Sequence, residues 1–291
     1  MTNLLIRAWR KLNKTVNSFF FLDQWAILIG RNLDFESAAW DHFRPLVPSP
    51  DRYWADPFVI ARGENYYVFI EEKLYQTGLG RIACLTLDKD GNLLLNQSVL
   101  ERPYHLSYPF IFEYHDEMYM LPESAQNRTL EVYRCKQFPD QWEFVKNLMF
   151  DMYVVDATLF EHKDKWWLFA NIKTEGGSSL DKLYLFSANH PLAEVWDPHP
   201  RNPIIADIHS ARPAGRIFER DGELIRPSQD SSRRYGYALN FNRITLFDSM
   251  NYDETRLSTF YPPRQRGVLA IHTWNTDGGI TVSDAVIRRR K

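Results

Sequence analysis

Cysteine, net charge and long apolar runs are all scarce in this chain of 291 residues, and each scarcity excludes a class of protein. Two cysteines, Cys84 and Cys135, are too few for a disulfide framework or a metal site, and they favour a reduced, cytoplasmic compartment. The formal net charge of −2 lacks the basic footprint of a nucleic-acid-binding protein. No apolar run reaches the ~20 residues that a membrane-spanning helix needs.

Motifs that would indicate a cofactor are also missing. The chain has no phosphate-binding glycine loop, no catalytic serine elbow and no zinc motif, so we expect neither a cofactor nor a metal. Basic residues interrupt the early apolar positions, which argues against a secretory signal. No low-complexity linker divides the chain, and all-β folds of this length commonly form one domain.

The first 16 residues have the spacing of an amphipathic helix. Leu5, Trp9, Leu12 and Val16 recur at helical intervals, while the basic residues fall mostly on other sides. A basic helix of this kind either lies in a membrane interface or packs its apolar side on the rest of the protein. Both arrangements stay open, so we expect a cytoplasmic protein, with peripheral contact at the inner membrane face through residues 1–16 as one alternative.

The remainder of the chain repeats itself. Four stretches share one short pattern, and each is followed by a polar turn and a second apolar strand. A period near 50 residues built only of short strands is typical of a β-propeller, whose four-stranded blades take roughly 40–50 residues each. The pattern positions, which are 52, 48 and 56 residues apart, are Asp56, Tyr108, Asp156 and Arg212.

A fifth blade is predicted from the two ends of the chain. Strands expected at 267–274 and 280–287, joined by a turn at 275–279, form a hairpin that cannot complete a blade alone. A strand expected at 24–30 is their partner, because this pairing removes the open edge of the ring. We therefore predict an all-β fold: a single five-bladed β-propeller over residues 17–291, preceded by the helix at 1–16.

A propeller brings the first strand of every blade to one central axis, so Asp56, Asp156 and Arg212 would face a shared funnel. Fifteen residues after the first three pattern positions, the second strands carry Glu71, Glu123 and an asparagine. Charged residues are rarely buried unless they are paired, so several carboxylates and an arginine on the axis predict a polar site. The alternative for Asp56 and Asp156 is that each caps a strand end by bonding backbone amides.

The chemistry of such a site fits sugars, since glycosyl transfer uses carboxylates on either side of an anomeric carbon. Asp56 is the first candidate for a base and Asp156 the second carboxylate. Glu123 is the third, with a pKa that burial would raise. Arg212 is suited to a bidentate grip on a phosphate or a sugar carboxylate, and Trp54 to stacking on a sugar face. The full set of candidates for substrate binding is Trp54, Glu71, Tyr108, Arg212, Arg226, Gln229, Asp230 and His272.

A set of short motifs over roughly residues 45–285 carries a family resemblance. They are Trp54-Ala55-Asp56-Pro57-Phe58, Ser107-Tyr108-Pro109-Phe110, Pro122-Glu123-Ser124, Asp156-Ala157, Ser210-Ala211-Arg212-Pro213-Ala214-Gly215, Arg226-Pro227-Ser228-Gln229-Asp230 and Tyr235-Gly236. Together they resemble the N-terminal propeller domain of plant glucosamine inositolphosphorylceramide transferases and its bacterial relatives. That domain is in turn similar to the five-bladed arabinanase, xylosidase and invertase-like glycosidases.

The resemblance implies roles for three positions. In those glycosidases the aspartate of an Ala-Asp-Pro motif is the general base, a later aspartate tunes it, and a glutamate is the acid. Asp56 matches the first and Asp156 matches the second by repeat position. Arg212 stands where the glutamate would be expected, which puts hydrolysis in doubt.

An arginine in place of the acid suits a phosphate leaving group, which needs charge stabilisation more than a proton. We therefore expect a glycosyltransferase that moves a sugar from a nucleotide- or lipid-phosphate donor to a glycan or glycolipid acceptor in the funnel, as in polysaccharide biosynthesis. Two alternatives stay open: an arabinanase-like glycoside hydrolase, and a propeller that binds carbohydrate without catalysis.

Overall fold

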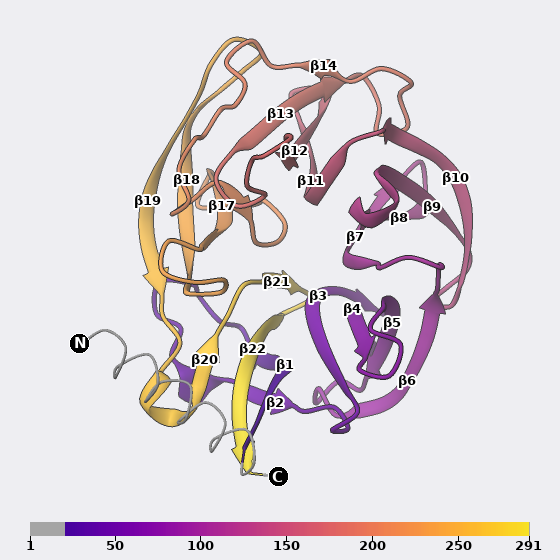
Figure 1. The fold of residues 1–291 in the computed structure, drawn as a ribbon, viewed down its shortest axis with the longest axis vertical. Helices are drawn as coiled ribbons and strands as arrows, with labels where there is room; N and C mark the ends of the chain where they lie inside the picture. Colours follow the sequence, from indigo (N-terminus) through magenta and orange to yellow (C-terminus); the bar gives the residue numbers. More distant parts are fainter. Residues whose placement is uncertain (1–20, 291) are drawn as a thin grey trace, which may run out of the picture.

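The computed structural model describes residues 21–290, and Figure 1 shows their strands as five sheets arranged around a central axis. The predicted five-bladed propeller is confirmed. The expected helix at 1–16 lies outside the described residues. Within the described part of the chain, no helix is long and apolar enough to cross a membrane.

The first three blades each run from an inner to an outer strand in chain order. Blade one comprises β3 (Arg52–Arg62), β4 (Asn65–Leu74), β5 (Gly80–Leu87) and β6 (Leu93–Leu100). Blade two comprises β7 (Ser107–Tyr114), β8 (Glu117–Ser124), β9 (Thr129–Gln137) and β10 (Gln141–Phe150). Blade three comprises β11 (Tyr153–His162), β12 (Lys165–Lys173), β13 (Leu183–Ala188) and β14 (Asp197–Pro198).

Blade four has a divided inner strand. Its sheet comprises β15 (Arg212–Pro213), β16 (Phe218–Arg220), β17 (Glu223–Asp230), β18 (Ala238–Phe247) and β19 (Tyr252–Phe260). Both β15 and β16 pair with β17, and the chain between them leaves the ladder. The three short 3₁₀ helices η1 (Trp40–His42), η2 (Ala125–Asn127) and η3 (Arg264–Arg266) lie between strands.

Both ends of the described chain build blade five, as predicted. β1 (Phe21–Arg31) pairs antiparallel with β22 (Ile280–Arg290) along its whole length, from Phe21 opposite Arg290 to Arg31 opposite Ile280. β2 (Arg44–Leu46) pairs with the outer side of β1, and β21 (Trp274–Asp277) with the axial side of β22. The closure joins both ends of the described chain in one sheet, so the ring has no open gap between its first and last blades.

One predicted strand of blade five is wrong. Residues 267–274 form β20 (Val268–Ala270), a break, and then the start of β21. The break arises because Asp284 Oδ1 accepts hydrogen bonds from the backbone amides of His272 and Thr273, at 3.1 and 3.0 Å, so these amides do not join the ladder. The hairpin turn is therefore shorter than predicted and contains Gly278 and Gly279, both with positive φ.

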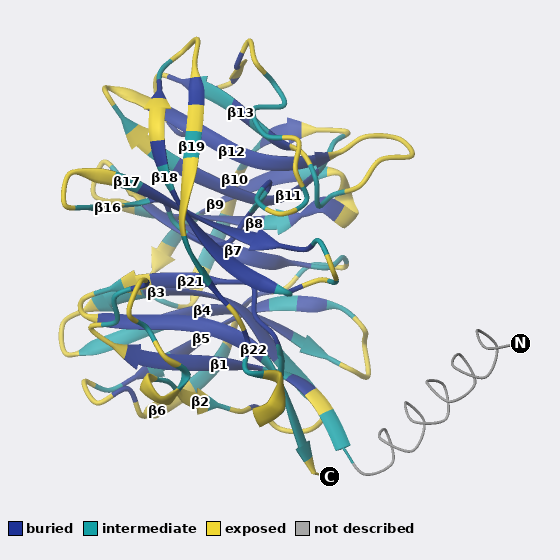
Figure 2. Cartoon of the chain, turned by 90° about the vertical axis from the view of Figure 1, so that its left-hand side faces the viewer, coloured by how far each residue is buried: buried dark blue, intermediate teal, exposed yellow. Residues whose placement is uncertain are grey.

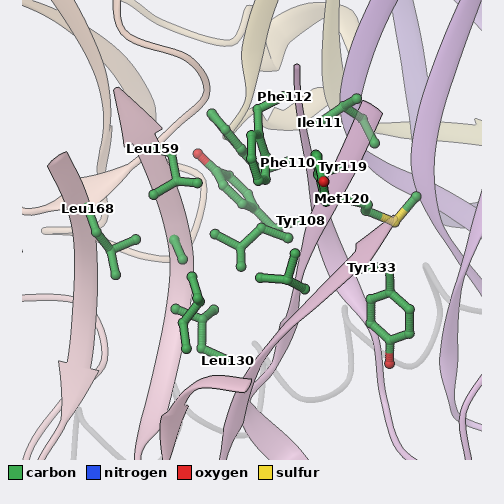
Figure 3. Packing of buried hydrophobic residues seen from close by; sticks show 14 of the residues in the cluster. Tyr108, Phe110, Ile111, Phe112, Tyr119, Met120, Leu130, Tyr133, Leu159 and Leu168 are labelled. Carbon is green, nitrogen blue, oxygen red and sulfur yellow. The ribbon is translucent and has the colours of Figure 1, made fainter. Parts of the chain in front are cut away.

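The apolar core lies between neighbouring blades. Inner strands are buried along most of their length, whereas outer strands such as β6 and β19 are largely exposed (Figure 2). The largest cluster joins blades one to three and includes Phe110, Met120 and Leu168 (Figure 3). Cys84 is buried in this cluster and both cysteines are free thiols, as expected.

Candidate functional site

A β-bulge places the pattern residue of each of the first three blades at the axis. Asp56, Tyr108 and Asp156 have φ values of 52, 42 and 50°, a left-handed conformation that non-glycine residues seldom adopt. At each one the ladder to the second strand is interrupted, for example between Ala55 and Phe58. A bulge re-aims the side chain, and backbone strain of this kind clusters at functional sites.

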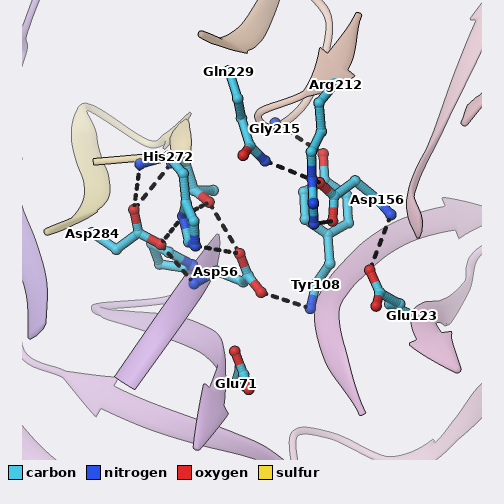
Figure 4. A network of polar contacts seen from close by, with 12 residues as sticks. Asp56, Glu71, Tyr108, Glu123, Asp156, Arg212, Gly215, Gln229, His272 and Asp284 are labelled. Atoms are coloured by element: carbon cyan, nitrogen blue, oxygen red, sulfur yellow. Dashed lines mark hydrogen bonds and ion pairs between the residues drawn. The ribbon is translucent and has the colours of Figure 1, made fainter. Parts of the chain in front are cut away.

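Blade four supplies its side chain differently. Arg212 pairs in register with Gln229 and is not at a bulge with positive φ. Its guanidinium nevertheless reaches the network from blade four: Nε donates to Asp156 Oδ2 at 2.5 Å and Nη2 to Asp156 Oδ1 at 3.3 Å. Gln229 Nε2 donates to the same Asp156 Oδ2 at 2.9 Å. The structure thus brings Asp156, Arg212 and Gln229 together, as predicted (Figure 4).

Asp56 lies at the junction of blades one, two and five. Its Oδ2 accepts from the backbone amide of Tyr108 at 3.2 Å, and its Oδ1 accepts from the Thr273 hydroxyl at 3.2 Å. Nε2 of His272 is 3.6 Å from Asp56 Oδ1. Burial raises the pKa of Asp56 to about 7, although His272 opposes this shift.

His272 is held between two carboxylates. Its Nδ1 lies 2.6 Å from Asp284 Oδ2, and its ring stacks on Trp25 with a centroid separation of 4.2 Å. Burial disfavours the imidazolium, but the Asp284 and Asp56 charges outweigh burial and raise the His272 pKa to about 9. The axis therefore carries a cation next to Asp56 at neutral pH.

Asp284 also fixes the backbone of the site. It is fully buried, and its Oδ2 accepts from the Asp56 amide at 2.9 Å while Oδ1 binds the two amides of the break in blade five. Asp56, His272 and Asp284 each have one atom that could bind a metal ion, and these three atoms lie within 4.8 Å of one another. Spacing in the sequence did not predict this group. In the structure the His272 Nδ1 of this group lies 2.6 Å from Asp284 Oδ2.

Glu123 and Glu71 stand on the second strands of blades two and one. Glu123 Oε2 accepts from the Asp156 amide at 3.3 Å, and burial, reinforced by the Asp156 charge, raises the pKa of Glu123 well above its ordinary value. Glu71 Oε1 accepts from the Tyr53 hydroxyl at 2.8 Å and lies 3.0 Å from His105 Nε2. Because His105 Nδ1 accepts from the Gly80 amide, Nε2 is the protonated nitrogen that faces Glu71.

Tyr108 crosses the axis and closes it. The side chain is fully buried, and its hydroxyl lies 2.9 Å from Thr158 Oγ1 and accepts from the Gly215 amide at 2.9 Å. Gly215 has a φ of 131°, and a Cβ there would meet the Trp274 carbonyl oxygen at 2.1 Å. Tyr108, expected to bind substrate, is instead a fully buried structural floor of the site.

Aromatic rings stand beside this floor. Tyr235, 42% exposed, lies edge-on to His272 at 5.1 Å and is covered by the Arg212 guanidinium at 5.2 Å. Tyr53 and Trp25 are partly buried neighbours. Rings with a polar edge above a set of carboxylates form a surface suited to a sugar.

The structure corrects the expected positions of three candidates. Trp54 is buried in the core with its Nε1 donating to Glu72 at 3.0 Å, so it cannot stack on a ligand. Arg226 is buried and paired with Glu254 at 2.6 Å, away from the axial carboxylates. Asp230 binds the amide and hydroxyl of Ser232 and so shapes the loop that carries Tyr235.

Comparison with known proteins decides the family. The model of the N-terminal domain of glucosamine inositolphosphorylceramide transferase 1 matches residues 43–278. This chain belongs to that family. Proteins named glucosamine inositolphosphorylceramide transferase 1 from Oryza sativa subsp. japonica and Arabidopsis thaliana are 32% and 31% identical to it, over 82% of the chain in each case. The match covers 33% and 32% of those proteins, so the chain spans about a third of their length.

Solved structures show that this transferase N-terminal family shares its fold with glycoside hydrolases. A family 117 glycoside hydrolase from Zobellia galactanivorans superimposes with a TM-score of 0.59 at 12% identity, covering 91% of both chains. An α-L-arabinofuranosidase from Lactobacillus brevis gives a TM-score of 0.56 at 13% identity, covering 76% of this chain and 78% of its own. Identities this low establish the five-bladed fold alone.

Sequence analysis did not identify several residues of the site. Asp284 interrupts a row of alternate apolar residues, Ile280, Val282 and Val286, and that was a usable signal. Tyr53 adjoins the candidate Trp54, and Tyr235 was part of the motif Tyr235-Gly236 but was given no role in the site. Trp25 and His105 had no signal, because only the ring closure and the turn before β7 bring them to the axis.

Proposed function

We propose that this propeller is a glycosyltransferase that moves a sugar from a nucleotide- or lipid-phosphate donor to a glycan or glycolipid acceptor at the axial site. The observation that carries the proposal is Asp56: a buried carboxylate with a pKa of about 7, in a strained backbone, among aromatic rings. A base with a pKa near the working pH is well matched to removing a proton from a hydroxyl group.

The step follows from the side chains present. Asp56 takes the proton of an acceptor hydroxyl, and the oxygen forms a bond to the anomeric carbon of the donor. The bond from that carbon to the phosphate oxygen breaks, and the electron pair leaves with the phosphate. Arg212 uses Nε and Nη2 to hold Asp156, so its Nη1 is the group that supports the leaving phosphate. Glu123, kept protonated, donates a hydrogen bond to a sugar oxygen.

The relatives support a sugar substrate. Those matched are named glucosamine inositolphosphorylceramide transferase 1, and this chain corresponds to about a third of their length. The donor, the glycolipid acceptor, a cytoplasmic location and membrane contact through residues 1–16 all belong to the proposal.

One observation favours a second candidate, a propeller that binds carbohydrate without catalysis. Tyr108 fills the axis and its backbone amide bonds to Asp56, as expected where the aspartate only supports the fold. In this case the aromatic rings and carboxylates would hold a sugar that reacts elsewhere.

Turnover of a panel of nucleotide sugars separates these functions, with nucleotide, free sugar and glycosylated acceptor each measured. We expect glycosylated acceptor to form, and we expect its rate of formation to fall by roughly a hundredfold or more in Asp56→Asn. The matched control is Asp116→Asn, an exposed turn residue with a φ of 60°, which keeps full activity. Binding without turnover would establish the second candidate, free sugar alone would establish hydrolysis, and full activity of Asp56→Asn would remove Asp56 as the base.

A further inference from the structure

The propeller has a cavity at the opposite end of its axis from Asp56. It measures about 540 Å³, within the range of small-molecule sites. The inner segments of all five blades line it, through residues that include Ile60, Phe112, Phe160, Arg216 and Asp277. A ligand there would contact every blade at once.

This cavity is separate from the candidate active site. Asp56 and Ile60 are four residues apart along β3, which at about 3.3 Å per residue separates the two ends by roughly 13 Å. Tyr108, tied to Thr158 and to the Gly215 amide, fills the axis between them. A ligand in one site therefore does not reach the other.

Arg216 provides a cation for this cavity. Its Nη1 donates to the Val59 carbonyl at 3.2 Å and its Nη2 to the Ile111 carbonyl at 2.9 Å. No carboxylate of residues 21–290 lies within ion-pair distance of the guanidinium; burial lowers its pKa to about 10, and the more distant Asp277 charge opposes that shift. Arg216 is half-buried and its guanidinium donates only to neutral carbonyls, so its charge is only partly compensated by Asp277 and it still attracts an anionic group.

Carboxylates line the same cavity. Asp277 Oδ2 accepts from the Ala61 amide at 2.7 Å, which fixes the side chain, and its other oxygen remains to bind a ligand. Glu113 and Glu161 are exposed lining residues. The lining thus combines one guanidinium with several carboxylates, a set that complements a ligand with both a negative and a positive group.

The remaining wall is apolar. Phe112 and Trp166 are 8% and 7% exposed, with ring centroids 5.8 Å apart, and Leu159 lies beside them. Figure 3 shows Phe110, Phe112 and Leu159 around Tyr108. The apolar part of a ligand can pack against this wall while its charged groups are bound elsewhere in the cavity.

We propose that this cavity is a second ligand site, specific for an apolar or aromatic α-amino acid. The ligand carboxylate pairs with Arg216, the ammonium group with Asp277, and the side chain packs on Phe112 and Trp166. In an α-amino acid the carboxylate and the ammonium group are bonded to the same carbon atom. This short separation matches a guanidinium and a carboxylate that line one small cavity. The proposal is independent of sugar transfer.

Titration calorimetry with the full chain tests it, using L-phenylalanine, L-leucine and two phenylalanine analogues. Phenylalaninamide lacks the carboxylate and 3-phenylpropionate lacks the ammonium group. We expect the amino acids to bind, and each analogue to bind at least tenfold more weakly. Asp277→Asn keeps an acceptor for the Ala61 amide, and we expect it to lower the affinity for L-phenylalanine at least tenfold. The control is Asp164→Asn, a change at an exposed turn residue at the same end, which should leave this affinity unchanged.

A thermal melt checks that Asp277→Asn is folded; if it is not, the binding of phenylalaninamide and 3-phenylpropionate to the wild-type protein tests both charge contacts without a substitution. Equal binding of L-phenylalanine and both analogues would overturn the proposal, and so would no binding at all.

Discussion

At Asp56 the protonation state decides what the residue can do. Its carboxyl has a pKa of about 7 because it is buried, and only the ionised form accepts a proton from a hydroxyl. If Asp56 is the base, transfer should increase as the pH rises through about 7. Glu123 acts in its protonated form, so activity should fall again at higher pH as that carboxyl ionises. A pH profile of kcat/KM tests this; a rate that stays flat through pH 7 would contradict the role of Asp56.

Glu123 makes a separate prediction about stability. Its pKa is raised in the folded protein, so the stability it contributes is present below its ordinary pKa and is lost as the pH rises through the folded value. Glutamine has the same shape, stays neutral and can still accept from the Asp156 amide. Glu123→Gln should therefore melt at a similar temperature to the wild type in mild acid, and above it in alkaline solution.

Melting curves of both proteins between about pH 5 and pH 9 give the comparison. Glu117→Gln is the control, because this exposed glutamate on the same strand has ordinary access to solvent. A wild type that gains stability relative to Glu123→Gln as the pH rises would show that Glu123 is ionised in the folded protein.

Among the elements, the segment between β15 and β16 is the tightest point of the ring. Gly215 donates to Tyr108 from a conformation that favours glycine, and any Cβ would collide with the Trp274 carbonyl. Gly215→Ala should cost roughly 3 kcal/mol or more. Gly63→Ala, at a turn with a φ of 62° and open space around it, should cost only about 1–2 kcal/mol. Urea unfolding measures both, and equal losses would contradict a packed axis at Gly215.

The elements also show how far sequence reasoning reaches. The repeat of Asp56, Tyr108 and Asp156 was visible because each is followed by a recognisable strand, and the structure brings Asp156 to Arg212 as this repeat predicted. The β-bulges were not visible, since no glycine marks them. Trp54 was misplaced because the bulge at Asp56 breaks the alternation that would otherwise put residues 54 and 56 on one face. Arg226 was misplaced because it is three residues from Gln229 and therefore faces the other side of its strand.

At the scale of the whole molecule, closure of the ring assembles the axial site around Asp56. Pairing of β1 with β22 brings Trp25 onto His272, and Asp284 then bonds to the Asp56 amide across the seam between blades five and one. Sequence patterns predicted this closure, because both ends of the chain carry strands without other partners. The contacts it creates depend on residues more than 200 positions apart, and no local pattern could reveal them.

A crystal structure of the protein soaked with a nucleotide sugar tests the central claim most directly. We predict that the diphosphate lies against Arg212, with the sugar between Asp56 and the ring of Tyr235. A nucleotide sugar bound elsewhere on the propeller, with Asp56 and Arg212 free of it, would contradict the assignment of the axial site.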